Sequence, residues 1–414
     1  MSYSQAPVQY GLAAAQSDVP ISLSSSGLPR PINSSVQIVS IASTSAAQQA
    51  NGQVTFSIPT GASAGYLKNN SMYLKCKVAI STAANTAAAT TFALKSSSAS
   101  ALINRLTVSC GKQLSQINNY HLLAEMLITH TTSRNFYSDD SSILQYTGRT
   151  AFAVNSVNGA SIDVVIPIVC PLFNADKALP LFLLNSPILV QFDLNSVANA
   201  FKNAGGEILN YTISSAQLVY EVIQPDMNFV AMIKAGMLPS AENPAGNMYQ
   251  LNIRDYMTLI TASSATLNYQ IGANLSSVNA VAYAQITNAP AQNADTRLVK
   301  NGQTNFRLAL DGRLVNNFNL DNEPQIFAEM NRSFANLFDS NITSNCSATD
   351  YSTDNFVGAV SCRRVSDVMS MTGTACQNIN LQLDSTGGNF NTYIVVLYDQ
   401  VLTIDATGTP NLIH

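Results

Sequence analysis

The chain has 414 residues, of which 46% are hydrophobic and only 11% are charged, and its formal net charge is −4. The length predicts two or three domains, and the hydrophobic content excludes a disordered polymer. The 20 lysines and arginines form no basic run, so we expect no direct nucleic-acid binding, which needs clustered cations.

Residues 1–33 are rich in Ser, Ala, Gln and Pro, and their only charged side chains are Asp18 and Arg30. This composition predicts an extended N-terminal arm and not a folded element. Two interpretations stay open: a floppy tail, or an arm that ties neighbouring subunits together.

Strand patterns dominate from residue 34 to residue 224. SMYLKCKVAI (71–80) alternates apolar and other residues, as a strand with one buried face does. We predict the strands of this half at 37–44, 53–59, 71–80, 101–117 (two strands around a Gly turn), 162–169, 187–194 and 212–224. After the Gly turn, Tyr120, Leu123 and Leu127 have helical spacing, and Asn118 or Asn119 is placed to cap a helix there.

Residues 225–247 change character and form the best linker candidate, with a short helix predicted at 229–237. Strand patterns resume from 248 to 405, and 406–414 read as a C-terminal tail. We predict strands at 248–260, 277–286, 304–318 (two strands around a Gly turn), 356–364, 379–384 and 391–404, and a helix at 324–338.

The two halves follow one plan. Ala-Glu-Met occurs at 124–126 and again at 328–330, each time in a helical stretch that follows two strands around a Gly turn. Short strands with a single helix favour antiparallel sandwiches over a parallel βαβ fold. We therefore predict an all-β protein with two domains, 34–224 and 248–405, each with one inserted helix.

The sequence offers no coherent catalytic, cofactor or metal site. Gly61-Ala-Ser63-Ala-Gly65 fits the Gly-x-Ser-x-Gly elbow of hydrolases, but a strand pattern and not a helix follows it. We expect His130 to support the C-terminal end of its helix, Asp139-Asp140 to be a solvated turn pair, and Glu125 and Glu329 to pair with backbone or Arg groups. The six cysteines, which form no Cys-x-x-Cys pair, are expected to be free and mostly buried: Cys76, Cys110, Cys170, Cys346, Cys362 and Cys376.

Several ordered stretches together resemble the double jelly-roll major capsid proteins of tailless icosahedral DNA viruses. ALINRLTVSCGKQLSQINNYHLLAEML (101–127) is similar to the family's strand–turn–strand–helix segment, with Asn-Asn-Tyr at the helix start. CPLFNADKALPLFLLNSPILVQFDLN (170–195) resembles its Leu-Pro-Leu segment. The helix at 324–338, FVGAVSCRRVSD (356–367) and the closing strand YIVVLYDQVLTID (393–405) extend the likeness over roughly residues 35–405. The absence of Trp and the thin Arg content depart from the family and leave the virus group open.

The resemblance implies two antiparallel eight-stranded jelly rolls in tandem, and three copies forming a pseudo-hexameric capsomer that tiles an icosahedral shell. It implies neighbouring capsomers and minor capsid and vertex (penton) proteins as partners, and an internal lipid membrane met through the arm at 1–33. The protein would act in the virion capsid, after assembly inside the host cell, without enzymatic activity.

The alternative is a carbohydrate-binding β-sandwich of a spike or adhesin, and an enzyme ranks third. The lack of Trp argues against a lectin, which favours exposed aromatic clusters. Oligomeric state separates these interpretations, because only the capsid protein must form trimers.

Overall fold

The computed structural model describes residues 34–82, 92–95, 99–131, 161–175, 177–203, 208–239, 246–263, 265–287, 298–316, 319–334, 348–353, 355–364, 372–387 and 390–413. The predicted arm at 1–33, Asp139-Asp140 and Cys346 lie outside these residues.

Eight long strands of the first half form two antiparallel sheets. In chain order they are β1 (Ser34–Ala42), β3 (Gln53–Ile58), β5 (Tyr73–Thr82), β7 (Ile103–Cys110), β8 (Lys112–Asn118), β9 (Ser161–Pro167), β11 (Ile188–Leu194) and β13 (Ile208–Pro225). Numbered one to eight, they give one sheet in the order 1-8-3-6 and another in the order 2-7-4-5. This exchange of strands between two sheets is the jelly-roll arrangement.

Short strands extend these sheets or pair beside them. They are β2 (Ala47–Gln49), β4 (Tyr66–Leu67), β6 (Phe92–Leu94), β10 (Leu179–Pro180) and β12 (Phe201–Asn203).

The first roll closes around side chains that alternate along its strands. Val54, Phe56 and Ile58 on β3 are buried, while the residues between them are partly exposed. Phe56 meets Phe192 of β11 edge to face at 6.0 Å. The period of two seen in the sequence therefore arises because successive side chains point to opposite faces of each sheet.

The second half repeats this strand order within one continuous curled sheet. Its strands are β14 (Tyr249–Ser263), β15 (Thr266–Thr287), β16 (Leu298–Val299), β17 (Gln303–Leu310), β18 (Arg313–Leu314), β19 (Gly358–Ser361), β20 (Thr374–Ser385), β21 (Phe390–Ile404) and β22 (Pro410–Ile413). The long strand β15 serves as both strand two and strand three, because residues 266–278 pair with β20 and residues 278–287 pair with β21. Register shifts at Gly272/Leu275 and Leu275/Val278 mark the bend.

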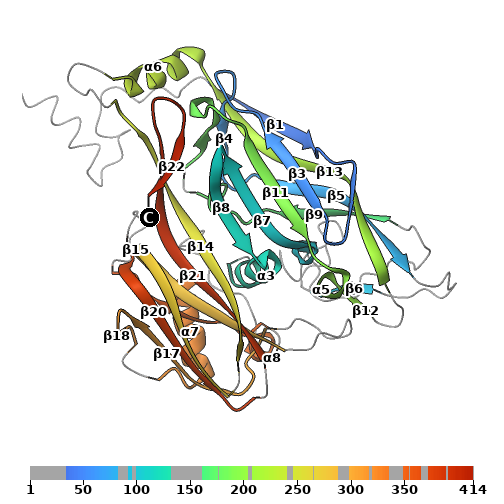
Figure 1. Ribbon diagram of the computed structural model, residues 1–414, viewed down its shortest axis with the longest axis vertical. Helices are drawn as coiled ribbons and strands as arrows, with labels where there is room; N and C mark the ends of the chain where they lie inside the picture. The colour runs from blue at the N-terminus through green and yellow to red at the C-terminus, as the bar shows by residue number, and fades with distance from the viewer. Residues whose placement is uncertain are drawn as a thin grey trace, which may run out of the picture.

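With β15 counted twice, the order is again 1-8-3-6 (β14, β21, β15, β19) and 2-7-4-5 (β15, β20, β17, β18). Figure 1 shows the two rolls side by side, the first in blue to green and the second in yellow to red. Domain boundaries at 34–224, 225–247 and 248–405 stay our proposal.

The two predicted helices occupy the same position in both rolls, between strands five and six. α3 (Tyr120–Thr131) is buried along most of its length, and α7 (Glu323–Phe334) buries Ile326, Met330 and Phe334. The carbonyl oxygen of Asn119 accepts hydrogen bonds from the amides of Leu122 and Leu123. The predicted residues 335–338 of the second helix lie outside the described part of the chain.

The remaining helical segments are short. They are η1 (Ala99–Leu102), η2 (Leu181–Leu183), α5 (Val197–Ala200), α6 (Met227–Met237) and α8 (Ala348–Thr353). α6 confirms the helix predicted between the two rolls, and the side chain of Asp226 caps it by accepting from the Asn228 amide at 2.9 Å.

The description of 406–414 as a tail is wrong for Pro410–Ile413, which form β22. This strand pairs with β21 from Val401↔Ile413 to Ile404↔Pro410. The sequence signal is weak because the strand has only four residues and starts with Pro, which is tolerated at a strand end.

Candidate functional site

The hydrolase motif does not form a nucleophile elbow. Residues 61–65 make a turn that leads into β4, with Ser63 exposed. A Cβ on Gly65 would lie 2.2 Å from the carbonyl oxygen of Ile223, so this glycine serves close packing against β13. Within the described ranges, no group of three or more His, Cys, Asp or Glu residues could hold a metal ion.

The two described histidines are buried, and burial lowers the pKa of each to about 4. His121 Nδ1 lies 3.2 Å from the Asn195 amide nitrogen. His130 Nε2 lies 3.0 Å from the carbonyl oxygen of Asn355, and its ring stacks on Phe334 at 6.4 Å. The prediction that His130 supports the helix C-terminus by charge is wrong, because its imidazole is neutral at neutral pH and instead joins α3 to the second roll.

The remaining candidate residues, Glu329 and Glu125, are those expected to pair with backbone or Arg groups. Glu329 pairs with Arg332 at 2.9 Å, as predicted. Glu125 is fully buried in α3, and its predicted pairing stays a prediction.

Free, buried thiols are confirmed for five of the six cysteines: Cys76, Cys110, Cys170, Cys362 and Cys376. Burial raises the pKa of Cys76, Cys170 and Cys362 to about 12. A nucleophilic cysteine needs the thiolate form, so these three thiols are poor nucleophiles at neutral pH.

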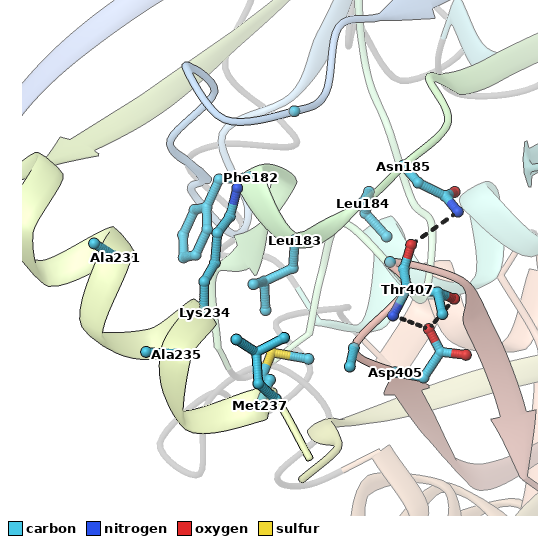
Figure 2. Close-up of a pocket in the computed structure, with 14 residues that line it drawn as sticks. Phe182, Leu183, Leu184, Asn185, Ala231, Lys234, Ala235, Met237, Asp405 and Thr407 are labelled. Atoms are coloured by element: carbon cyan, nitrogen blue, oxygen red, sulfur yellow. Dashed lines mark hydrogen bonds between the residues drawn. The ribbon is translucent and has the colours of Figure 1, made fainter. Parts of the chain in front are cut away.

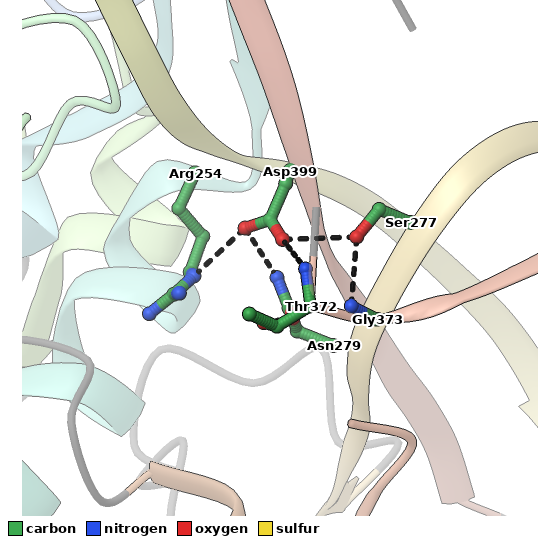
Figure 3. Close-up of polar contacts among 6 residues, drawn as sticks. All are labelled: Arg254, Ser277, Asn279, Thr372, Gly373 and Asp399. Atoms are coloured by element: carbon green, nitrogen blue, oxygen red, sulfur yellow. Dashed lines mark hydrogen bonds and ion pairs between the residues drawn. The ribbon is translucent and has the colours of Figure 1, made fainter. Parts of the chain in front are cut away.

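A connected polar cluster surrounds Asp399 on β21 (Figure 3). Its carboxylate accepts hydrogen bonds from Ser277 Oγ at 2.9 Å, Asn279 Nδ2 at 2.5 Å and the Thr372 amide at 3.2 Å. Arg254 Nε lies 3.4 Å away. With both oxygens occupied, Asp399 holds the bend of β15 against its neighbouring strands instead of acting as a free acid or base.

Sequence patterns do not predict this cluster. Its one visible signal is Asp399 itself, an acidic residue inside the apolar run from Tyr393 to Leu402.

The two rolls are joined where β8, strand five of the first, meets β14, strand one of the second. Thr258 Oγ1 donates to the Asn118 carbonyl oxygen at 2.9 Å, and the Asn118 amide donates to Thr258 Oγ1 at 3.2 Å. Ser115 Oγ lies 3.3 Å from an Asp255 carboxylate oxygen. Burial raises the pKa of Asp255 to about 6. These hydrogen bonds make the joint directional, and together with the stacking of His130 on Phe334 they set one roll against the other.

A groove of about 600 Å³ lies at one end of this joint, between η2, α6 and the turn at 405–408 (Figure 2). Leu183, Leu184 and Met237 line it, and Lys234 lies on its α6 side. In the turn, Asp405 accepts from the amides of Thr407 and Thr409, both at 2.9 Å. The Thr407 hydroxyl also donates to Asp405 at 2.6 Å. This hydrogen bond, followed by those from the Thr409 and Thr407 amides, lowers the pKa of Asp405, and its carboxylate is thereby committed to the turn.

This fold matches known proteins by structure, although not by sequence. No protein-family profile and no curated protein matches the sequence. Solved structures do match over nearly their whole length. The Faustovirus major capsid protein is 8% identical with a TM-score of 0.60, covering 95% of this chain and 96% of its own. The structure of VP54 of PBCV-1, fitted into a reconstruction of the Sputnik virophage, is 13% identical with a TM-score of 0.60, covering 94% and 99%. The mavirus major capsid protein is 13% identical with a TM-score of 0.51, covering 94% and 91%.

The fold is a double jelly roll. The structures that match are double jelly-roll major capsid proteins of icosahedral DNA viruses, and the strand order found here gives the same fold twice in one chain. Sequence identities of 8% and 13% support a shared fold and no more. The predicted all-β architecture with two jelly rolls is confirmed.

The double jelly roll exposes several large apolar side chains at the end that carries the groove. On α6 and beside it, Met227, Met232, Leu238 and Met248 are each more than half exposed. On β1, Val36 is 59% and Ile38 is 75% exposed. Exposed apolar groups gathered in this way mark contact surfaces. No helix among the described residues is long and apolar enough to cross a membrane.

Proposed function

We propose that this protein is a major capsid protein, three copies of which form a capsomer of six jelly rolls. The observation that carries the proposal is the same strand order in both rolls. Two similar rolls in one chain let three chains present a near-hexagonal outline, which can tile a shell. The match to capsid proteins over at least nine tenths of each chain supports this function.

A structural role also fits the chemistry of the described residues. The acidic, thiol and imidazole groups described above are buried or committed to neighbouring groups, so we propose that the protein is not an enzyme. Its 11% charged residues suit a chain whose surface is largely covered by partners. The carbohydrate-binding spike or adhesin is not favoured, since the structures that match are capsid proteins.

The proposal also includes the partners of the capsomer. They are the neighbouring capsomers and minor capsid and vertex proteins in the virion, with no direct contact to nucleic acid. An internal lipid membrane is proposed to meet the arm at 1–33. Flotation of trimers with liposomes tests this contact, and equal flotation after removal of residues 1–33 would show that the arm is not responsible.

The deciding experiment is light scattering of the purified protein, combined with negative-stain electron microscopy. We expect a mass of three chains and particles with a hexagonal outline. Monodisperse monomers over the accessible concentration range would overturn the capsomer and raise the binding-module alternative.

A further inference from the structure

β1 is an exposed edge strand without the usual protection. It pairs with β13 alone, which leaves its outer backbone edge without a described strand partner. All nine of its residues are exposed or half-buried, including Val36 and Ile38. Natural edge strands are guarded by charge, proline or bulges, but no charged residue lies between Arg30 and Lys68. A long uncharged edge that exposes Val36 and Ile38 calls for a cover.

The joint inside the chain shows how the corresponding strand of the second roll is covered. β14 occupies the position in the second roll that β1 occupies in the first, since each is strand one and pairs with strand eight. β14 is covered by β8, strand five of the first roll, through the contacts of Thr258 and Asp255. Asp255 also lies near Cys170, in the segment after strand six.

The second roll carries the same receiving elements, and the described chain leaves them open. Strand five is β18, where Leu314 is 52% exposed. β18 and the segment after strand six, Cys362–Arg364, line a hollow of about 630 Å³. Thus the elements of the first roll that contact β14 have counterparts in the second roll, and these counterparts line a hollow beside the exposed Leu314.

We propose that β1 of one copy docks on β18 and the hollow beside it in a neighbouring copy. The occupant is a second copy of this chain, because the contact repeats between chains the joint that already links the two rolls within one chain. Val36 and Ile38 would cover Leu314. Arg313 and Arg364, which also line the hollow, would donate to the unpaired carbonyl oxygens on the outer edge of β1.

The placement of the two surfaces suits a closed ring. Figure 1 shows β1 and β18 on opposite sides of the molecule. Each copy therefore offers one donor strand and one receiving surface, which is a heterologous contact and forms a ring when the rotation closes. The inference rests on the proposed trimer and names the surface that builds it.

Cross-linking tests the contact directly. In a background with Cys346→Ser, the pair Ile38→Cys and Leu314→Cys is treated with a short bis-maleimide. We expect covalent dimers and trimers on a denaturing gel. The control pair Leu209→Cys and Leu314→Cys uses another exposed leucine of the first roll, 55% exposed, and should stay monomeric. Trimers in solution without cross-linking of the Ile38/Leu314 pair would overturn this inference and leave the proposed function intact.

A charge at the same site gives an independent readout. Ile38→Lys should raise the Kd of trimer dissociation by roughly a hundredfold, because a lysine would be buried against Arg313 and Arg364. The thermal midpoint of the monomer should be unchanged, since Ile38 is exposed. Leu209→Lys is the matched control and should leave trimers whole. Trimers of Ile38→Lys as tight as the wild type would place the interface elsewhere, whereas a wild-type protein that never forms trimers would refute the proposed function itself.

Discussion

Asp255 is a carboxyl group whose ionisation is coupled to the joint between the rolls. It accepts hydrogen bonds from the Tyr256 amide at 2.8 Å and from Tyr398 Oη at 3.2 Å, and Ser115 Oγ lies 3.3 Å away. Burial nevertheless outweighs these hydrogen bonds and raises its pKa to about 6. The charged form is therefore less stable in the folded protein than in the unfolded chain.

This raised pKa predicts a pH dependence with a definite sign. Below about pH 4 the carboxyl is protonated in both states and contributes nothing. As the pH rises from about 4 to about 6, the unfolded chain loses its proton first, so the free energy of unfolding falls, by roughly 3 kcal/mol in total. Asp255→Asn removes the titration. The measurement is urea unfolding of both proteins at several pH values between 4 and 7.

The comparison isolates Asp255 because His121 and His130 are present in both proteins. Their lowered pKa values act in the opposite direction, since stability is lost as the pH falls from about 6.5 towards 4. The difference between wild type and Asp255→Asn should therefore change steadily across the window. Two parallel stability curves would show that Asp255 does not titrate as described.

At the scale of elements, β19 lies so close to β15 that only a glycine fits. A Cβ at Gly358 would lie 2.2 Å from the ring of Tyr283. That ring cannot move freely, because it packs on Phe306 at 4.4 Å and its hydroxyl donates to Gln303 at 2.6 Å. Gly358→Ala should lower the free energy of unfolding by about 1 to 3 kcal/mol through overpacking.

Gly272 provides the matched control for this change. It lies in the first part of β15, where a Cβ would meet nothing within 4 Å. Gly272→Ala should leave stability unchanged or raise it slightly, since it restricts the unfolded chain. The two denaturation midpoints are measured side by side, and an equal loss in both variants would refute the close approach of β19.

Sequence patterns predicted three helices and most of the strands because alternation and helical spacing are local signals. They missed the first part of β15, predicted only as 277–286, although LNYQIGANL (267–275) alternates apolar and polar residues, because Gly272 and the asparagines of this stretch have low strand propensity. The Asp399 cluster was also out of reach. Ser277, Thr372 and Asp399 meet only through strand register in the folded sheet, which the order of residues along the chain does not reveal.

At the scale of the whole molecule, the same kind of joint links the two rolls within a chain and, in the proposed contact, links neighbouring chains. The two uses differ in chemistry. The β8–β14 joint within the chain is polar, built on Asp255, Thr258 and Asn118, and the stacking of His130 on Phe334 adds an aromatic contact beside it. The proposed contact between chains is apolar on the β1 side, so the ring depends mainly on the burial of hydrocarbon.

This difference predicts how the trimer responds to solution conditions. An interface held by apolar burial should change little when NaCl rises to molar concentration, since screening weakens only exposed charge pairs. Sulfate should strengthen association and cooling should weaken it, as burial of apolar surface does. Sedimentation velocity at fixed protein concentration measures the trimer fraction under each condition. Dissociation of the trimer by NaCl alone would instead show that ion pairs hold the interface. The arginines that line the hollow beside β18 would then have to contact acidic groups of the neighbouring copy and not the uncharged β1.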